Sequence, residues 1–165
     1  MISFEDFIYK GKPFLGEATI ARLSKIVHSK FRVLEFGSGG STVWFAERCA
    51  LIRTHEGSME VVEKIYYTLK EKGLERKVEF LLNARYPRFI PRFDKDTFDL
   101  IVVDGRSRLL CLESTIGSLK PGGWVLLDNA EVHEDCVAFM DKLKWHREDT
   151  RGWRKTAVAI FWRKP

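Results

Sequence analysis

The stretch Val33-Leu34-Glu35-Phe36-Gly37-Ser38-Gly39-Gly40-Ser41-Thr42 joins an apolar run to a glycine turn, and residues 43–49 are predicted to continue as a helix. The three glycines of the turn permit backbone conformations and close approaches that a Cβ would block. The N-terminus of the helix offers free N–H groups to the negative end of a ligand, and Ser41 and Thr42 are equally suited to cap it. This order of strand, glycine turn and helix is typical of a nucleotide-binding turn.

A carboxylate follows the next apolar run, residues 51–55. Glu56 lies nineteen residues after Gly37, at the predicted end of a strand, where a carboxylate can accept hydrogen bonds from both hydroxyls of a ribose. A dinucleotide fingerprint would place its third glycine at position 42, which holds Thr42. NAD is therefore disfavoured. A P-loop nucleotidase is excluded because no G-x-x-x-x-G-K-S/T sequence occurs.

Short apolar runs alternate with stretches of helical period, which is typical of a parallel α/β sheet. Strands buried on both faces are predicted at residues 31–36, 51–55, 78–82, 98–103 and 124–127. The helical stretch after residue 108 is predicted to run through Leu119 and to be stopped by Pro121-Gly122-Gly123. Two last strands, 145–148 and 156–162, are too close in sequence for a helical crossover and should pair antiparallel.

The composition predicts one globular domain over residues 1–165. The chain is 45% hydrophobic and 31% charged, and its longest apolar run is far shorter than the roughly 20 residues that span a bilayer. We therefore expect no membrane association, and acids instead of basic residues near the start lead us to expect a cytoplasmic protein. The three cysteines have no C-x-x-C spacing, so neither a disulfide framework nor a thiolate zinc site is predicted.

The motif Glu35-Phe36-Gly37-Ser38-Gly39-Gly40-Ser41 resembles the first motif of class I S-adenosylmethionine-dependent methyltransferases, in which an acid ends the first strand two positions before a glycine. Ser41 replaces the commoner third glycine. The resemblance covers roughly residues 17–163 and implies a three-layer Rossmann-like fold, with a mostly parallel seven-stranded sheet and an antiparallel C-terminal hairpin. It implies S-adenosylmethionine as the cofactor, bound by Glu35, Gly37, Ser38, Gly39, Gly40, Ser41, Glu56, Gly57, Asn83, Ala84 and Asp104.

A narrower resemblance concerns two later strand ends, residues 98–105 and 126–129. They are similar to those of catechol and caffeoyl-coenzyme A O-methyltransferases, whose equivalent residues hold a divalent metal. This resemblance implies a Mg²⁺ site at Asp104, Asp128 and Asn129, and two carboxylates with an amide oxygen suit that ion. The branch places a lysine three residues after the first Asp, where this chain has Ser107. A second interpretation therefore stays open, in which Asp104 touches substrate, Asp128 caps the next helix and Asn129 lies in the turn.

The family resemblance implies methyl transfer to an acceptor by in-line displacement, in which positioning supplies most of the catalysis. An acceptor hydroxyl must also lose a proton, and Asp104, Asp128 and His133 are the candidate catalytic residues. We expect O-methylation of a small-molecule acceptor.

Two other functions and one assembly stay open. The charge excess of +5 lies in residues 141–165, so the basic hairpin with Arg151 and Arg154 could dock RNA or protein for methylation. No N/D-P-P-Y/F sequence of the amino-methylating nucleic-acid enzymes occurs. A noncatalytic S-adenosylmethionine-binding module is the other alternative. An exposed sheet edge could also pair two chains into a homodimer.

Overall fold

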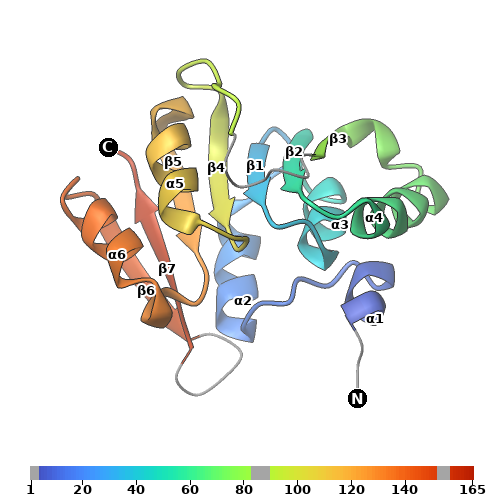
Figure 1. Cartoon of the computed structure of the whole chain (residues 1–165), viewed down its shortest axis with the longest axis horizontal. Coiled ribbons are helices and arrows are strands. Elements are labelled where there is room, and N and C mark those ends of the chain that lie inside the picture. Colours follow the sequence, from blue (N-terminus) through green and yellow to red (C-terminus); the bar gives the residue numbers. More distant parts are fainter. Residues whose placement is uncertain (1–3, 83–89, 152–156) are drawn as a thin grey trace.

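A computed structural model describes residues 4–82, 90–151 and 157–165, and it has the predicted three-layer α/β architecture (Figure 1). One seven-stranded sheet has the order β3-β2-β1-β4-β5-β7-β6. The strands are β1 (Arg32–Phe36), β2 (Leu51–Glu56), β3 (Val78–Leu82), β4 (Phe98–Val103), β5 (Leu119–Leu127), β6 (His146–Arg151) and β7 (Val158–Arg163). β1 to β5 pair in parallel, and β7 runs antiparallel to both β5 and β6. The prediction of a parallel sheet closed by an antiparallel hairpin is confirmed.

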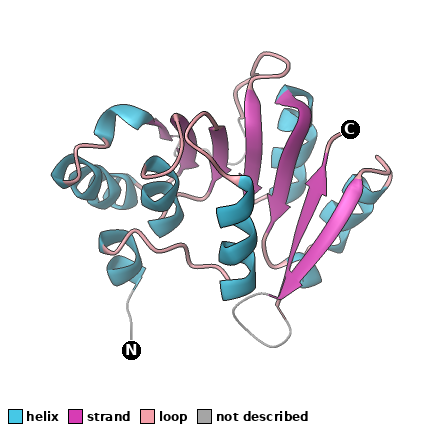
Figure 2. Cartoon of the chain, turned by 180° about the vertical axis from the view of Figure 1, so that it is seen from behind, coloured by secondary structure: helices cyan, strands magenta, loops and turns pink. Residues whose placement is uncertain are grey.

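Helices cover both faces of the sheet (Figure 2). They are α1 (Phe4–Tyr9), α2 (Glu17–Ile26), α3 (Gly40–Ala46), α4 (Met59–Glu71), α5 (Arg108–Thr115) and α6 (Glu134–Asp141), with short 3₁₀ turns η1 (Glu75–Lys77), η2 (Ile116–Ser118) and η3 (Ala130–Val132). Leu23 of α2 and Ile65 of α4 belong to one apolar cluster with Val33. Cys111 of α5 belongs to a second cluster with Leu34. Successive strand residues therefore face opposite helix layers, as the alternation of a strand requires.

The start of β5 differs from the prediction. α5 ends at Thr115, and β5 begins at Leu119 and contains Pro121-Gly122-Gly123. The β4–β5 register jumps between Phe98 and Leu100, so the extra residues form an irregularity inside the strand. Leu119 is fully buried there, and an apolar residue at that spacing fits a helix or a strand equally well. The helical period alone therefore could not place the boundary.

The C-terminal hairpin packs against the first helical layer. The Arg22 guanidinium of α2 donates to both carboxylate oxygens of Glu148, at 2.5 and 2.8 Å, and the Thr19 and Thr150 hydroxyls lie 2.9 Å apart. Among the described residues, no helix has the length and apolar character needed to cross a bilayer.

Candidate functional site

The carboxyl ends of the central strands bring the predicted site residues to one edge of the sheet. Backbone hydrogen bonds continue the ladder past the strands: Gly37 N–H donates to His55 O at 3.1 Å, and Asp104 N–H donates to Phe36 O at 3.0 Å. Asp128 N–H donates to the last carbonyl of β4, that of Val103, at 3.3 Å. The residues that follow β1, β2, β4 and β5 are therefore held side by side, where ligands of open α/β sheets bind.

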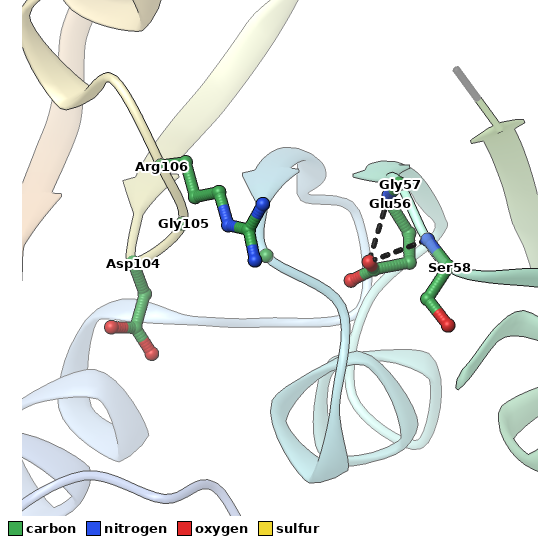
Figure 3. A pocket seen from close by; sticks show the side chains of 7 residues that line it. Glu56, Gly57, Ser58, Asp104, Gly105 and Arg106 are labelled. Carbon is green, nitrogen blue, oxygen red and sulfur yellow. Dashed lines mark hydrogen bonds between the residues drawn. The ribbon is translucent and has the colours of Figure 1, made fainter. Parts of the chain in front are cut away.

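A cleft of about 440 Å³ opens at this edge (Figure 3). Its volume lies in the range of about 300–1,000 Å³ that is usual for small-ligand sites. It is lined by Gly37, Glu56, Gly57, Ser58, Asp104, Gly105 and Arg106. Figure 3 shows Asp104 and Arg106 on the β4 side and Glu56 across from them on the β2 side. Sequence reasoning had proposed Gly37, Glu56, Gly57 and Asp104 for the site but not Ser58, Gly105 or Arg106.

Three backbone N–H groups hold the carboxylate of Glu56. Its Oε1 accepts hydrogen bonds from Gly57 N–H at 2.7 Å and from Ser58 N–H at 2.9 Å, and its Oε2 accepts from Ser38 N–H at 3.3 Å. A carboxylate offers about four acceptor sites, so a ligand hydroxyl can still bind it. Glu56 thus joins the end of β2 to the glycine turn and presents a fixed acceptor to the cleft.

Gly37 and Gly40 lie against different parts of the chain, and each leaves no room there for a Cβ. Gly37 has φ +96°, and a Cβ there would lie 3.0 Å from Gly105 Cα and N. The turn and the loop after β4 are therefore in backbone contact beside the cleft. A Cβ on Gly40 would lie 2.1 Å from Lys12 O and 2.5 Å from Phe7 O. The close approach at Gly40 is therefore made by the end of α1 and the segment that follows it.

Glu35 lies fully buried in β1 beneath the turn. Its Oε1 accepts from the Ser41 hydroxyl at 2.5 Å, and its Oε2 accepts from Thr42 at 2.6 Å and from Thr54 at 2.8 Å. Burial raises the pKa of Glu35 to about 7, although the three hydroxyl donors lower it.

The rest of the turn shares these contacts. The Ser38 hydroxyl lies 2.6 Å from that of Thr54, and Gly39 N–H donates to the Thr42 hydroxyl at 3.0 Å. Glu35, Ser38, Gly39 and Ser41 thus form a hydrogen-bonded support under the turn. Their predicted contact with the cofactor stays a prediction.

Asp104, Asp128 and Asn129 come together around a side chain that sequence reasoning did not assign, Arg108. The Arg108 Nη2 lies 3.3 Å from both Asp104 Oδ1 and Asn129 Oδ1. Its Nε donates to Gly105 O at 2.9 Å, and its Nη1 donates to Asp128 O. The Arg108 side chain is only 8% exposed, whereas that of Asp104 is 29% exposed beside the cleft. The guanidinium therefore occupies the centre of the set.

The two aspartates are in a poorly hydrated environment. Burial and then the Asp128 charge raise the pKa of Asp104 to about 7, against the Arg108 charge, which lowers it. Burial raises the pKa of Asp128 to about 6, while a backbone hydrogen bond from Asn129 and the Arg108 charge lower it. Within the described part of the chain, the buried Asp128 Oδ1 has no hydrogen-bond partner. Both carboxyl groups are therefore costly to ionise.

The set does not fit a divalent metal as it stands. A metal bound to the Oδ1 atoms of Asp104 and Asn129 would lie against the guanidinium nitrogen that already contacts both. Two cations at that separation repel in a poorly hydrated site. Asn129 has φ +48° and begins the η3 turn, which agrees with its place in the second interpretation. The predicted capping role of Asp128 is not seen, because neither η3 nor α6 has a side-chain cap hydrogen bond from the described residues.

The remaining predicted residues lie elsewhere. His133 is half-buried at the start of α6, and burial and the Arg108 charge lower its pKa. It is therefore near the Arg108 set without lining the cleft. Asn83 and Ala84 lie outside the described residues. Ser58, Gly105 and Arg106 line the cleft and were not predicted. They directly follow the predicted Gly57 and Asp104, so their place just after a strand end is the sequence signal that could have identified them.

A mostly parallel sheet of this order with an antiparallel C-terminal hairpin, and a ligand cleft at the ends of β1, β2 and β4, define a class I methyltransferase fold. The family described as "Methyltransferase domain" matches residues 34–130, which is more than half of the chain. The chain therefore belongs to this family of S-adenosylmethionine-dependent methyltransferases. No curated protein matches the sequence significantly.

Solved structures share this fold at low sequence identity. A SAM-dependent methyltransferase from Aquifex aeolicus is similar over 100% of both chains, at 13% identity and a TM-score of 0.69. The O-methyltransferase TomG from Streptomyces achromogenes, in complex with SAM, is similar over 90% of this chain and 78% of its own, at 19% identity and a TM-score of 0.63. A tRNA methyltransferase from Aquifex aeolicus is similar over 100% of this chain and 70% of its own, at 20% identity and a TM-score of 0.62.

Proposed function

We propose that the protein is an S-adenosylmethionine-dependent O-methyltransferase for a small-molecule acceptor and that the whole chain acts as one domain. The observation that carries the proposal is the cleft that Glu56, at the end of β2, and Asp104, just after β4, line from opposite sides. One side offers a fixed carboxylate for a ribose, and the other offers a carboxyl group for the reacting acceptor. The methyltransferase family and the SAM complex of the TomG structure support the choice of cofactor.

In this proposal the β1 and β2 ends bind the cofactor. Glu56 accepts hydrogen bonds from the ribose hydroxyls, and Gly37 and Gly57 leave room for the ligand to approach the backbone. The hydrogen-bonded support under the turn, formed by Glu35, Ser38, Gly39 and Ser41, keeps the turn in place. Asn83 and Ala84 remain the proposed contacts of the adenine.

The β4 end carries the chemistry. When bound, S-adenosylmethionine would supply a methyl group on a positively charged sulfur. The acceptor oxygen would bond to the methyl carbon in line as the carbon–sulfur bond breaks, and S-adenosylhomocysteine would be the leaving group. Asp104 lies at the cleft and accepts the proton that the acceptor hydroxyl loses, after which its carboxyl group is neutral. Arg108, anchored beneath, keeps this carboxyl group in position. Asp128 and His133 flank this arrangement, so their roles are supporting ones.

The described hairpin gives less support to a nucleic-acid acceptor. Arg147 donates to Asp149 at 2.7 and 2.8 Å and to Asp141 at 2.7 Å, and the Trp162 side chain is buried in the core. Arg151 is exposed, whereas Arg154 and Lys155 lie outside the described residues. The similar tRNA methyltransferase shares the fold at 20% identity. Methylation of RNA or protein is therefore an outcome to be tested.

The test is transfer of a labelled methyl group from S-adenosylmethionine to three pools: phenols and other hydroxylated small molecules, total RNA, and cell protein. We expect labelling of a small molecule by the wild-type protein. Labelling of RNA or protein alone would replace the proposed acceptor class. Binding of S-adenosylmethionine with no labelled product in any pool would favour the noncatalytic module.

A further inference from the structure

We propose that the Arg108 guanidinium is a resident cation that takes the place of a divalent metal at the β4–β5 strand ends and positions Asp104. The inference rests on the proposed function only in placing the reaction beside Asp104. Its basis is the set of atoms that the guanidinium contacts: the side-chain oxygens of Asp104 and Asn129, and the main-chain oxygens of Asp104, Gly105 and Asp128.

The contacts of Arg108 resemble the first shell of a hard cation. All of them are oxygens, and two are the side-chain atoms that a metal would need, Asp104 Oδ1 and Asn129 Oδ1. A guanidinium has five N–H donors in a fixed plane, so a single side chain can satisfy oxygens from both strand ends. The single positive charge of Arg108 lowers the pKa of both aspartates, which is the direction in which a bound ion would also act.

Arg108 is also anchored against displacement. Three of its contacts are to main-chain carbonyls, which cannot swing away as side chains do. Its position at the start of α5 follows Ser107, whose φ of +46° turns the chain back beneath Asp104. An incoming metal would have to break all these contacts and expose a side chain that is 92% shielded, since only 8% of it is accessible.

This arrangement has a consequence for the acceptor. A metal at such a site can bind two neighbouring oxygens of one acceptor at the same time, whereas a guanidinium whose donors all face the protein does not chelate a ligand. The acceptor therefore needs only one reactive hydroxyl beside Asp104. Methyl transfer should proceed unchanged in the presence of a chelator such as EDTA.

The test measures Mn²⁺ binding in the absence of cofactor and acceptor, by electron paramagnetic resonance and titration calorimetry. The wild-type protein should show no saturable site. Arg108→Met removes the charge and keeps an unbranched side chain, so two carboxylates then lack a counter-charge. It should bind one Mn²⁺ per chain, roughly tenfold or more tighter than the wild-type protein. Adding Asp128→Asn to this variant should abolish the gained site.

Two further variants separate the effect of the positive charge from that of changing the side chain. Arg108→Lys restores a cation and should again exclude Mn²⁺, and Arg48→Met, at an exposed arginine of another helix layer, should behave as the wild-type protein does. Melting curves establish that each variant is folded. If Arg108→Met does not fold, the titration of the wild-type protein still tests the inference, which requires that no saturable Mn²⁺ site is present.

A one-to-one Mn²⁺ site in the wild-type protein, lost in Asp128→Asn, would overturn the inference. So would a folded Arg108→Met protein that binds no more Mn²⁺ than the wild-type protein. Because the titration needs neither methyl donor nor acceptor, its outcome is independent of the labelling test. An absence of methyl transfer would overturn the proposed function and would not change the interpretation of the Mn²⁺ titration.

Discussion

Glu35 and Asp104 lie at the ends of neighbouring strands, and burial raises the pKa of each carboxyl group to about 7. Their surroundings differ. Three hydroxyl groups surround Glu35, which is fully buried. Asp104 contacts a guanidinium on one side and the cleft on the other. Two carboxyl groups with similarly raised pKa values therefore have different roles. Glu35 supports the glycine turn, and Asp104 is the proposed acceptor of a proton.

A shifted pKa by itself therefore does not identify a carboxyl group that takes part in a reaction. The three hydroxyl groups donate to Glu35 and favour its ionised form, since they lower its pKa against the effect of burial. The Arg108 guanidinium only donates, and its charge favours ionised Asp104. Exposure to the cleft then decides which carboxyl group can exchange a proton with a ligand.

The largest effect is expected for Asp104→Asn. If Asp104 accepts the proton of the acceptor, the turnover rate should fall by roughly 10²- to 10⁴-fold, because an amide cannot take up the proton. Binding of S-adenosylhomocysteine should change little, since Glu56 lies across the cleft. The measurement is the labelled-methyl assay with the acceptor that the screen yields.

An exposed aspartate gives the control for this variant. Asp94→Asn should retain full turnover, because Asp94 lies on the surface outside the cleft. Equal rates for Asp104→Asn and the wild-type protein would remove Asp104 from the chemistry and make it resemble Glu35.

A pH-dependent effect is expected for Glu35→Gln. The pKa of Glu35 is raised in the folded protein, so its contribution to stability is complete below about pH 4.5 and is lost as the pH rises through about 7. That loss amounts to about 3 kcal/mol of unfolding free energy for a shift of this size. The uncharged glutamine has no such loss.

Urea unfolding at several pH values measures the difference. The stability of Glu35→Gln relative to the wild-type protein should rise between pH 5 and pH 8. Comparing the two proteins cancels the opposite contribution of His55, whose pKa burial lowers to about 4. Parallel pH profiles would show that Glu35 is not a buried titrating group in the folded protein.

A smaller effect is expected for a glycine of the turn. Gly40→Ala would place a Cβ 2.1 Å from Lys12 O, so the segment after α1 would have to move, at a cost of about 2 kcal/mol in unfolding free energy. Gly117→Ala is the matched control because nothing lies within 4 Å of its Cβ position, and it should change stability by less than about 1 kcal/mol. Thermal melting compares them, and equal melting temperatures would contradict the packing at Gly40.

Much of this fold could be predicted because strands and turns leave local signals. The runs at β3 and β4 have the predicted boundaries. β4 has the predicted buried character, but the prediction was wrong for β3, an edge strand whose Glu79 and Leu82 are exposed. Glu56 and Asp104 could be proposed for one site because the carboxyl ends of parallel strands meet at one edge. The start of β5 was missed because Leu119 fits both helical and strand periods.

Other features depend on contacts between distant segments. The role of Arg108 requires the left-handed Ser107 and the neighbouring β5 end, neither of which a residue pattern around Arg108 reveals. The close packing at Gly40 depends on a segment nearly thirty residues earlier in the chain. In the sequence, such a glycine cannot be distinguished from a ligand-binding one, because a glycine that makes room for backbone and a glycine that makes room for a ligand are the same residue type.

The most direct test of the account is calorimetric titration with S-adenosylhomocysteine of the wild-type protein, Glu56→Ala and Glu60→Ala. Glu60 is an exposed glutamate four residues further along. We expect one ligand per chain, an affinity for Glu56→Ala that is lower by roughly tenfold or more, and no change for Glu60→Ala. Folded wild-type protein that binds no S-adenosylhomocysteine, or a folded Glu56→Ala protein that binds as well as the wild-type protein, would contradict the account.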